Sequence, residues 1–517
     1  FQAEDGIRDL VRSRGLGDVY KRQVLDSLES ALQAHFGWDR FRAGQRAVVE
    51  AVLDGRDALA VLPTGGGKSL CYQLPALVRD GLVVVISPLV ALMEDQVLAL
   101  QKRGITAACL HAGLDPCRRQ QAMARLRDES LRLLYIAPER LQGEAMRQML
   151  ENHASEGRLV ALAVDEAHCI SAWGHDFRPD YRRLGMIRRL CPGVPMLALS
   201  ATAAPRVRAD ILRLLDLRSP LVQVSSARRV NLNYTMQRRP RDPMPQVLEA
   251  LEQSRGAALI YARTRRSVEL WAERLREQKV DATPYHAGLD PDTRRTALTR
   301  FFAQKRPVLV ATVAFGMGVD RGDVGLVLHL DLPATPEGYL QESGRAGRDG
   351  QPASCLVLFS PGDRTTLSWA MQASGRSGSS LEERRRLDLA QQQLRRMEAV
   401  AEGEMCREQA LLLAVGELVS PCGHCDRCKT APNHRDWSAQ VQTLLSHLAD
   451  QEGMDLRRLG EHLALHEPGR GDRWTWLARR LVQEELIRES NDGAQRLYLR
   501  ESGRSFLKTP WPLDYAA

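Results

Sequence analysis

The segment 62–69, LPTGGGKS, has the residue types and spacing of a loop that binds phosphate groups. Backbone N–H groups of its glycines, together with the start of the helix that follows, would present positive partial charge to a triphosphate. Lys68 would add a full positive charge at the β- and γ-phosphates, and the Ser69 hydroxyl would bind Mg²⁺. Leu62 stands where the usual spacing has its first glycine, so a plain glycine-rich turn is the alternative.

Two adjacent carboxylates, Asp165 and Glu166, follow the apolar run at residues 159–164. Parallel sheets bind their ligands at the C-terminal ends of their strands. We expect Asp165 to hold Mg²⁺ through its water shell, and Glu166 to orient and deprotonate the attacking water. A solvated strand end is the alternative, and the phosphate loop upstream in the same α/β series favours the catalytic interpretation.

Two arginines, Arg345 and Arg348, lie close together in the segment 341–350, QESGRAGRDG. The planar guanidinium group stabilises the charge that spreads over phosphoryl oxygens in a transition state. We expect both arginines to reach the γ-phosphate from a second lobe. A surface pair of arginines is the alternative.

The cysteines include a cluster whose spacing is typical of a metal site, Cys406, Cys422, Cys425 and Cys428. Four thiolates with two C-x₂-C steps match tetrahedral Zn²⁺. Disulfides are the alternative, but the scattered positions of the other cysteines fit a reducing compartment better. His424 could replace one ligand, although its place between two cysteines predicts a ring that faces outward.

Apolar, β-prone runs alternate with helical patterns and predict two α/β lobes, each with a parallel sheet covered on both faces. The hexapeptide HAGLDP at residues 111–116 recurs at residues 286–291, which supports a relationship between the lobes. The runs lie at 57–62, 82–87, 106–110, 131–136, 159–164 and 195–200, and then near 257–262, 281–285, 307–311, 325–330 and 353–359.

The chain continues with helical patterns after the second lobe. A Ser/Gly-rich linker at 373–380 precedes a charged helix at 381–405, which has an apolar side made of Leu387, Leu394, Met397 and Ala401. Residues 437–506 predict three helices and a β-hairpin, which together make a winged helix. In its last helix, 472–485, Trp474 falls on the apolar side and Trp476 on the opposite side, as a DNA-facing ring.

In order, the chain carries motifs that resemble those of RecQ-family DNA helicases of helicase superfamily 2, over residues 36 to 430. The extension of the DEAH box, CISAWGHDFRPDY, is what separates RecQ proteins from the wider superfamily. The motifs are FGWDRFRAGQ (36–45), LPTGGGKSLCYQ (62–73), SPLVALMEDQV (87–97), YIAPERL (135–141), DEAHCISAWGHDFRPDY (165–181), LSAT (199–202), LIYARTR (259–265), ATVAFGMGVDRGDV (311–324) and QESGRAGRDG (341–350).

The resemblance implies a role for individual residues around ATP. Gln45 would read the adenine edge with Arg42, while Trp38 would stack on the base, unless Trp38 is a core residue. Arg321 and Gly322 stand where Lys-Pro is common in the family. The implied nucleotide-binding residues are Trp38, Arg42, Gln45, Thr64, Gly65, Gly66, Gly67, Lys68, Ser69, Gly318, Asp320 and Gln341, and Ser200 and Thr202 would link the two lobes.

The resemblance also implies contacts with DNA. Aromatic rings and a cation form a sequence-tolerant grip on bases in the loop that follows the DEAH box. Core packing is the stronger alternative for Phe177. The implied DNA contacts are Trp173, His175, Phe177 and Arg178 in this loop, and Arg473, Trp476 and Arg480 in the winged helix.

The net charge of +8 and the pI near 9.0 favour a polyanionic partner, and no apolar run is long enough to predict a membrane span. We divide the chain into a non-native or disordered leader (1–23), two RecA-like lobes (24–220 and 221–360), a helical zinc-binding subdomain (361–434), a winged-helix domain (435–510) and a tail (511–517).

The resemblance implies an enzyme that couples ATP hydrolysis to 3′–5′ movement on single-stranded DNA and to unwinding of forked duplex DNA in repair and recombination. It would use ATP, Mg²⁺ and Zn²⁺ in the bacterial cytoplasm, at the nucleoid. A DEAH-type RNA helicase and a DNA-binding scaffold that has lost hydrolysis are the alternatives.

Overall fold

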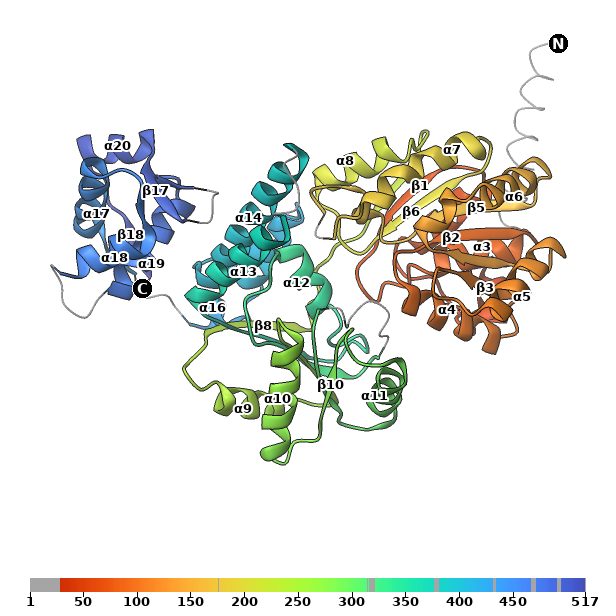
Figure 1. Cartoon of the computed structure of the whole chain (residues 1–517), viewed down its shortest axis with the longest axis horizontal. Coiled ribbons are helices and arrows are strands. Elements are labelled where there is room, and N and C mark those ends of the chain that lie inside the picture. The colour runs from red at the N-terminus through yellow and green to blue at the C-terminus, as the bar shows by residue number, and fades with distance from the viewer. Residues whose placement is uncertain are drawn as a thin grey trace, which may run out of the picture. The chain divides into compact units, whose positions relative to one another are not determined.

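The computed structural model describes residues 28–174, 176–313, 315, 321–375, 381–430, 434–465, 471–490 and 494–516 (Figure 1). The chain divides into two compact units, of which the first ends at Ala227 and the second begins at Arg228. No helix in the described part of the chain is long and apolar enough to cross a membrane. The predicted leader, residues 1–23, lies outside the described residues.

A seven-stranded parallel sheet forms the centre of the first unit, in the order β3-β4-β2-β5-β6-β1-β7. The strands are β1 (Ala58–Val61), β2 (Leu82–Ile86), β3 (Ala107–Leu110), β4 (Leu133–Ile136), β5 (Leu159–Val164), β6 (Met196–Ser200) and β7 (Leu221–Val224). The helices are α2 (Gln45–Leu53), α3 (Leu70–Val78), α4 (Val90–Lys102), α5 (Pro116–Arg127), α6 (Glu144–Ser155), α7 (Ile187–Leu190) and α8 (Pro205–Leu214), with 3₁₀ segments η1 (Pro138–Gln142), η2 (Ala167–Ile170) and η3 (Pro179–Met186).

Alternate side chains of this sheet enter two separate apolar cores, one on each face. In β1, Leu59 and Val61 pack with side chains of α5, α6 and α8. Ala58 and Ala60 pack instead with side chains of α2, α3 and α4. A strand that is buried on both faces must be apolar at nearly every position. The six strands that the sequence predicts for the first lobe are therefore confirmed.

One buried carboxylate ties three strands of the first unit together at their N-terminal ends. Asp57, which precedes β1, accepts hydrogen bonds from Arg188 Nη2 at 2.5 Å and from the Met196 N–H at 2.8 Å. It also accepts from the Arg218 N–H at 2.6 Å, shortly before β7. Both Asp57 and Arg188 are buried. Removing either partner would leave a buried charge without its counter-charge.

The second unit contains a six-stranded parallel sheet in the order β10-β11-β9-β12-β13-β8. The strands are β8 (Leu232–Arg238), β9 (Ala257–Tyr261), β10 (Ala282–Tyr285), β11 (Val308–Ala311), β12 (Val324–His329) and β13 (Ala353–Phe359). The helices are α9 (Met244–Gln253), α10 (Arg265–Glu277), α11 (Pro291–Ala303) and α12 (Pro336–Ser343).

The two strands that the sequence pattern misses, β7 and β8, lie at the edges of their sheets. Strand β7 alternates half-buried and exposed residues, and β8 alternates buried and half-buried ones before its exposed end. A rule that looks for continuous apolar runs does not find such strands. Because β7 pairs with β1, the first unit extends to Ala227, and the predicted lobe boundary at residue 220 is placed too early.

The repeated HAGLDP hexapeptide forms the same local structure in both units. His111 Nε2 lies 3.3 Å from Glu94 Oε1 of α4, and His286 Nε2 lies 3.0 Å from Glu269 Oε1 of α10. Both histidines are buried. The aspartate of each copy caps the next helix, at Asp115 for α5 and Asp290 for α11. The repeat thus fixes the passage from a strand to the next helix.

Helices α13 (Pro361–Gly375), α14 (Leu381–Glu402), α15 (Arg407–Ala414) and α16 (Asp426–Lys429) follow the second sheet. The apolar side predicted for α14 is confirmed at Leu394, Met397 and Ala401, which are buried, and Leu387 is half-buried. The predicted linker begins too early, because α13 continues to Gly375. The rest of that linker, residues 376–380, lies outside the described residues.

The last part of the chain has the predicted order of three helices and a hairpin, with additional elements. These are β14 (His434–Asp436), α17 (Ser438–Asp450), β15 (Met454–Asp455), α18 (Leu456–Ala464), α19 (Gly471–Gln483), β16 (Ile487–Glu489), β17 (Arg496–Leu499), α20 (Glu501–Lys508) and β18 (Asp514–Ala516). Strand β17 pairs with both β15 and β16. The predicted tail is wrong, because β18 pairs with β14.

Candidate functional site

The phosphate loop lies between β1 and α3, at the C-terminal end of a central strand. Gly65 and Gly67 have φ angles of 79° and 73°, in the left-handed region that favours glycine. A Cβ atom on Gly67 would lie 2.4 Å from Gln45 Nε2, so no other residue fits there without displacing that side chain. The loop closes on itself where the Gly66 N–H donates to the Pro63 carbonyl at 2.8 Å.

Arg42 and Gln45 hold the phosphate loop from the outside. Gln45 Nε2 donates to the carbonyls of Gly66 and Gly67, at 3.1 and 2.9 Å. The Arg42 guanidinium donates to the Gly65 carbonyl. The backbone N–H of Arg42 donates to Gln45 Oε1 at 2.7 Å. The sequence assigns these two residues to adenine, and that role stays a prediction. Their contact with the loop was not predicted.

A hollow of about 560 Å³ lies beside Arg42 and Gln45, and these two residues line it together with residues 37–40. The Trp38 ring lies 5.6 Å from the Phe36 ring in a stacked arrangement, and it is 44% exposed. That exposure removes the alternative in which Trp38 is a core residue. An exposed aromatic face beside an amide and a guanidinium has the chemistry of a nucleobase pocket.

The two carboxylates stand directly after β5, which is separated from β1 by β6 alone. Burial raises the pKa of Asp165 to about 7, the Glu166 charge adds to the rise, and the Lys68 charge opposes it. Lys68 is therefore close enough for its charge to act on this carboxylate. A cation at Asp165 would favour its charged form, which fits the predicted Mg²⁺ position.

Glu166 has an unusual backbone and an unused oxygen. Its φ of 47° and ψ of 45° are left-handed, a conformation that costs free energy in a residue with a Cβ atom. Among the described residues, no hydrogen-bond partner contacts Glu166 Oε2, although His168 Nδ1 lies 3.3 Å away. A buried carboxylate oxygen with spare accepting capacity is suited to binding a water molecule or a cation.

A chain of short contacts joins the DEAH box to the LSAT segment. His168 Nδ1 lies 3.1 Å from Ser200 Oγ, and the Ser200 hydroxyl donates to the Thr202 carbonyl at 2.7 Å. Ser200, Thr202 and His168 are all buried. The sequence singled out Ser200 and Thr202 for a link between lobes, whereas the structure places them in contact with the catalytic segment.

The aromatic loop after the DEAH box packs closely onto the first unit. Trp173 contacts the apolar core, and Arg206 Cζ lies 3.3 Å from its ring centre. Phe177 and Trp173 are both half-buried, so their exposure does not separate core packing from DNA contact, and core packing stays the alternative for Phe177. Arg178 Nη1 donates to the Pro88 carbonyl at 2.9 Å and its guanidinium pairs with Asp176. His175 lies outside the described residues.

In the second unit, the turn after α12 carries the two predicted arginines. Arg345 is buried, and burial raises the pKa of Tyr261 to about 12 while the Arg345 charge opposes that rise. Gly347 has a φ of 55°, and its carbonyl accepts from Arg229 Nη2 at 2.7 Å and from Asn231 Nδ2 at 2.8 Å. Arg229 and Asn231, which shape this turn, were not predicted from any motif.

The other nucleotide-binding residues predicted for this unit can be followed only in part. Gly318 and Asp320 lie outside the described residues. Gln341 lies in α12, next to Glu342, whose Oε2 is 2.7 Å from His329 Nε2. The Arg321 guanidinium pairs with Asp323, which holds the pKa of that carboxyl below its usual range. The roles of Gln341, Arg345 and Arg348 toward ATP stay predictions.

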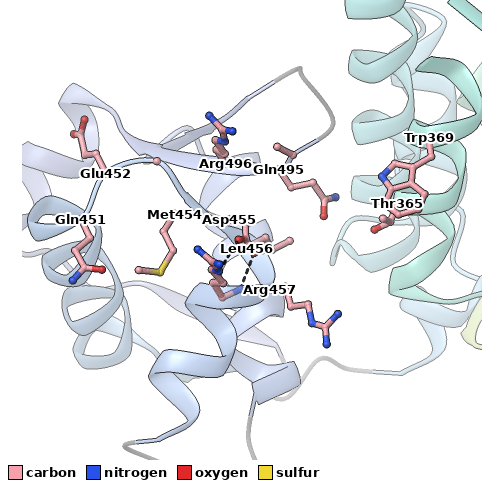
Figure 2. Close-up of a pocket in the computed structure, with 13 residues that line it drawn as sticks. Thr365, Trp369, Gln451, Glu452, Met454, Asp455, Leu456, Arg457, Gln495 and Arg496 are labelled. Carbon is pink, nitrogen blue, oxygen red and sulfur yellow. Dashed lines mark hydrogen bonds and ion pairs between the residues drawn. The ribbon is translucent and has the colours of Figure 1, made fainter. Parts of the chain in front are cut away.

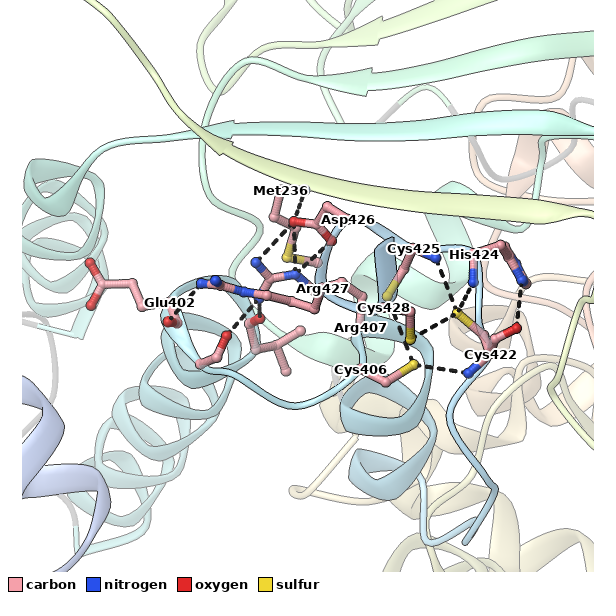
Figure 3. A network of polar contacts seen from close by, with 12 residues as sticks. Met236, Glu402, Cys406, Arg407, Cys422, His424, Cys425, Asp426, Arg427 and Cys428 are labelled. Carbon is pink, nitrogen blue, oxygen red and sulfur yellow. Dashed lines mark hydrogen bonds and ion pairs between the residues drawn. The ribbon is translucent and has the colours of Figure 1, made fainter. Parts of the chain in front are cut away.

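The four clustered cysteines converge as a metal site requires (Figure 3). Their sulfur atoms all lie within 4.8 Å of one another, with Cys422 Sγ to Cys428 Sγ and Cys425 Sγ to Cys406 Sγ both 3.9 Å. Tetrahedral Zn–S bonds of about 2.3 Å require sulfur atoms about 3.8 Å apart. All four thiols are free, so the disulfide alternative is wrong and the donor set fits Zn²⁺.

Contacts with β8, a strand of the second unit's parallel sheet, hold the cysteine cluster in place. His424 is not positioned as a ligand, because its Nδ1 lies 2.8 Å from the Cys422 carbonyl and its Nε2 lies 3.1 Å from the Leu232 carbonyl of β8. Buried Arg407 pairs with Asp426 through Nε and Nη2, both at 3.0 Å (Figure 3). Asp426 Oδ2 in turn accepts from the Met236 N–H of β8 at 3.3 Å.

The predicted DNA contacts of the winged helix differ in how exposed they are. Trp474 is buried, as predicted. Trp476 is half-buried, with its ring 5.0 Å from that of Trp437, and Arg473 Cζ lies 4.5 Å from the Trp437 ring. Arg480 lies 3.1 Å from Glu484 Oε1 and 3.5 Å from Glu404 Oε1, so its charge is already offset. DNA contact by these residues stays a prediction.

More exposed cations of this region surround a hollow of about 760 Å³ between α13 and the β15–α18 turn (Figure 2). Arg457 and Arg458 have side chains that are 88% and 80% exposed, and Arg496 lies on the neighbouring strand. The Trp369 side of the hollow is also open, since that residue is 66% exposed. The Arg-Arg doublet at the start of α18 is the sequence signal that could have identified this surface.

Comparison with known protein families matches three parts of the chain. The DEAD/DEAH box helicase family matches residues 42–211, and the helicase conserved C-terminal domain matches residues 242–350. The RecQ zinc-binding family matches residues 361–429, which include the cysteine cluster. These ranges contain the phosphate loop, the arginine turn and the metal site respectively.

Individual proteins show the same similarity over nearly the whole chain. The ATP-dependent DNA helicase RecQ of Haemophilus influenzae is 37% identical, over 94% of this chain and 80% of that protein. The protein of the same name from Pasteurella multocida is 36% identical, over 96% of this chain and 81% of that protein. Among solved structures, Mycobacterium smegmatis helicase Lhr bound to ssDNA and AMP-PNP has a TM-score of 0.52 at 18% identity, covering 90% of this chain and 59% of that one.

Proposed function

The chain belongs to the RecQ family of ATP-dependent DNA helicases, and we propose that it unwinds forked duplex DNA while moving 3′ to 5′ along one strand. The enzyme is an ATP-hydrolysing DNA helicase that uses Mg²⁺ and contains Zn²⁺. One observation carries the site assignment: the phosphate loop, the Trp38 hollow and the DEAH carboxylates all belong to the first unit, where Gln45 both lines the hollow and contacts the loop.

ATP binding begins with the groups that are already shaped for it. The Trp38 ring stacks on adenine, while the phosphate loop and Lys68 receive the triphosphate. Gln45 contacts both the phosphate loop and the base hollow, because its amide donates to the carbonyls of Gly66 and Gly67 and also lines the hollow. A bound adenine base would therefore compete with the loop for the Gln45 amide. Gln45 thereby makes the shape of the phosphate loop dependent on the base.

Hydrolysis depends on two carboxylates with different tasks. Asp165, with Ser69, holds Mg²⁺, and the metal supplies positive charge to the phosphate oxygens. Glu166 takes the proton of the attacking water through the oxygen that lacks a hydrogen-bond partner among the described residues. His168 then connects the state of Glu166 to Ser200 and Thr202. The motif pattern assigns Arg345 and Arg348 to the charge of the transition state.

DNA contacts come from both units. DNA binding at the aromatic loop changes the position of the DEAH box, because the loop follows that box directly in the chain. Arg178 of the loop also donates a hydrogen bond to the Pro88 carbonyl. In the predicted winged helix we assign duplex phosphates chiefly to Arg457, Arg458 and Arg496. The ion pairs of Arg457 with Glu461 and of Arg458 with Asp455 are exposed to solvent and therefore weak, whereas the Arg480 side chain is only 20% exposed between Glu404 and Glu484. We assign the Zn²⁺ site a structural role, because His424 and Asp426, which lie next to its cysteines, contact the backbone of β8.

Forked duplexes with a single tail test this proposal. We expect ATP-dependent strand displacement when the tail is 3′, and little when the tail is 5′. Displacement only from a 5′ tail would contradict the direction of movement. ATP hydrolysis that RNA stimulates and DNA does not would favour the RNA-helicase alternative. We propose repair or recombination in the bacterial cytosol, at the nucleoid, as the setting; what supports a bacterial setting is that RecQ proteins of two bacteria are 36–37% identical to this chain.

A further inference from the structure

A groove of about 680 Å³ on the first unit is lined by an unusual number of arginines. Its walls come from η1, α6, η3, α7 and the end of α8, so it is formed by elements other than the phosphate loop and the DEAH segment. Against these arginines stands one acidic side chain, Asp216. The lining residues are Gln142, Arg147, Arg182, Arg183, Gly185, Met186, Arg189, Arg213, Leu214 and Asp216, and we call this surface the arginine groove.

The fold keeps these cations at the surface. A Cβ atom on Gly185 would lie 2.4 Å from the Leu214 carbonyl, so glycine allows η3 to lie directly against the end of α8. Arg188 turns inward to Asp57 and is buried, while Arg183 and Arg189 are exposed and line the groove. Within residues 183–189, Arg188 is therefore structural, whereas Arg183 and Arg189 face solvent.

The carboxylates near the groove offset little of its charge. Arg213 Nη2 lies 2.9 Å from Asp210 Oδ1, and the arginine side chain is 70% exposed. Arg147 Nη1 lies 3.8 Å from an oxygen of Glu144, whose side chain is 85% exposed. Exposed pairs of this kind are weak and are screened by salt. A ligand with several negative charges could compete with them.

The spacing of the arginines favours a chain of phosphates over a single anion. Helical rises of about 2.0 Å per residue in η3 and about 1.5 Å in α7 place Arg182 and Arg189 about 12 Å apart along the chain. In a B-form duplex the phosphates of one strand are spaced about 3.4 Å along the helix axis, and an unpaired, extended strand spaces them more widely. A strand lying along this row would present several phosphates to it, whereas one small anion would contact only part of the row.

The arginine groove also adjoins the aromatic loop. Arg182 Cζ lies 5.2 Å from the ring centre of Phe177, so one side of the groove contacts the loop that the proposed function assigns to single-stranded DNA. We propose that the arginine groove is a second DNA-backbone site, which holds the strand beyond the aromatic loop without reading its bases. This inference rests on the proposed function for its ligand, and it concerns residues outside the ATP site.

Binding of single-stranded oligonucleotides to the full chain at a series of salt concentrations tests the inference. The variant Arg183→Gln/Arg189→Gln removes two cations, and its matched control is Arg125→Gln/Arg127→Gln, at two exposed arginines in the last turn of α5. Each lost phosphate contact lowers the slope of log affinity against log salt by about 0.7 for single strands, so the groove variant should lose about 1.4. The control should keep the wild-type slope.

Affinity for a long oligonucleotide, measured together with the ATPase kcat, provides a second readout. The groove variant should bind a long oligonucleotide about tenfold more weakly than wild type, yet keep its ATPase kcat at saturating DNA. Wild-type affinity and slope in the groove variant would overturn the inference, as would loss of poly-glutamate binding with DNA binding intact, which would assign the groove to an acidic peptide. Failure of wild type to unwind a fork would instead defeat the proposed function, which these binding measurements do not use.

Discussion

The two parallel-sheet units share one local structure and differ in what surrounds it. In both, a buried histidine of HAGLDP contacts a glutamate of the preceding helix, and the aspartate caps the following helix. In the first unit, the ends of β1 and β5 carry the phosphate loop and the DEAH carboxylates. In the second, the turn after α12 carries the two predicted arginines, and the chain continues into the cysteine cluster.

This comparison separates the residues that build the fold from those that perform the chemistry. The HAGLDP contacts are the same in a unit with a phosphate loop and in a unit with a different set of motifs, so their role is to join a strand to a helix. The left-handed Glu166 and the positive-φ glycines of the loop belong to the first unit's site. The strain at Glu166 is typical of a functional site, whereas glycine adopts a positive φ at little cost.

Removal of the metal should have the largest effect and should act on one unit. Structural zinc contributes about 10–16 kcal/mol to the folding of small zinc domains. We expect a strong chelator to release one Zn²⁺ per chain and to abolish strand displacement, while the first unit still binds a fluorescent ATP analogue. Metal analysis and nucleotide titration check this. A folded, active chain without zinc would show that the cysteine cluster is not a metal site.

Each unit also contains an arginine–aspartate pair with a buried arginine, and their loss should come next in size. Asp57→Ala leaves Arg188 unpaired in the first unit, and Arg407→Met leaves Asp426 unpaired in the second. Breaking a buried pair costs about 3–5 kcal/mol, which we expect for Asp57→Ala. Arg407→Met should cost less, because Asp426 is half-buried and water can reach its carboxylate, and urea unfolding would measure both losses. The double variant Asp57→Ala/Arg188→Met should recover part of the loss. A change below about 1 kcal/mol would mean that these pairs are not structural.

The helix caps of the shared hexapeptide should produce the smallest and most equal effects. Asp115→Ala and Asp290→Ala each remove a carboxylate that accepts backbone N–H groups at the start of a helix. We expect both to lower the unfolding temperature by a few degrees, with the ATPase kcat unchanged. An ATPase loss in one variant alone would break the equivalence of the two copies.

The pH dependence of one cap can be predicted in sign. Hydrogen bonds from Thr293 hold the pKa of Asp290 below its ordinary value of 3.8. The pKa of Asp290 is lower in the folded chain than in the unfolded chain. The cap therefore stabilises the folded chain when the pH is above the unfolded-state pKa, and this contribution is lost as the pH falls through the folded-state pKa. Asp290→Asn should therefore weaken the acid sensitivity of α11, as hydrogen exchange would show.

Sequence patterns predicted those parts of the molecule that have a single physical cause. Strands buried on both faces need apolar residues throughout, so β2 and β5 could be predicted, whereas the edge strands β7 and β8 could not. Cysteine spacing predicted the metal site because four ligands must converge. Contacts between distant segments, such as Gln45 with the phosphate loop or Asn231 with Gly347, have no local pattern.

The region predicted to form a winged helix, residues 435–510, shows the same limit. Helical periodicity placed Trp474 and Trp476 on different sides of α19, which is correct for the buried Trp474. It could not foresee that Trp437 and Tyr515 would pack against Trp476. Nor could it foresee that Glu404, from the bend between α14 and α15, would lie beside Arg480. Side-chain partners from other elements decide which half of an amphipathic helix stays available.

The central claim is that ATP hydrolysis in the first unit drives DNA unwinding, and strand displacement on a 3′-tailed fork tests it most directly. Glu166→Gln keeps the shape of the side chain and removes the base, so it should lower both ATP hydrolysis and unwinding by about 10²–10⁴-fold while ATP and DNA still bind. Glu269→Gln, a control at a carboxylate beside His286 in the second unit, should leave unwinding close to the wild-type rate. Unwinding by Glu166→Gln at the wild-type rate, or none by the wild-type chain, would contradict the account.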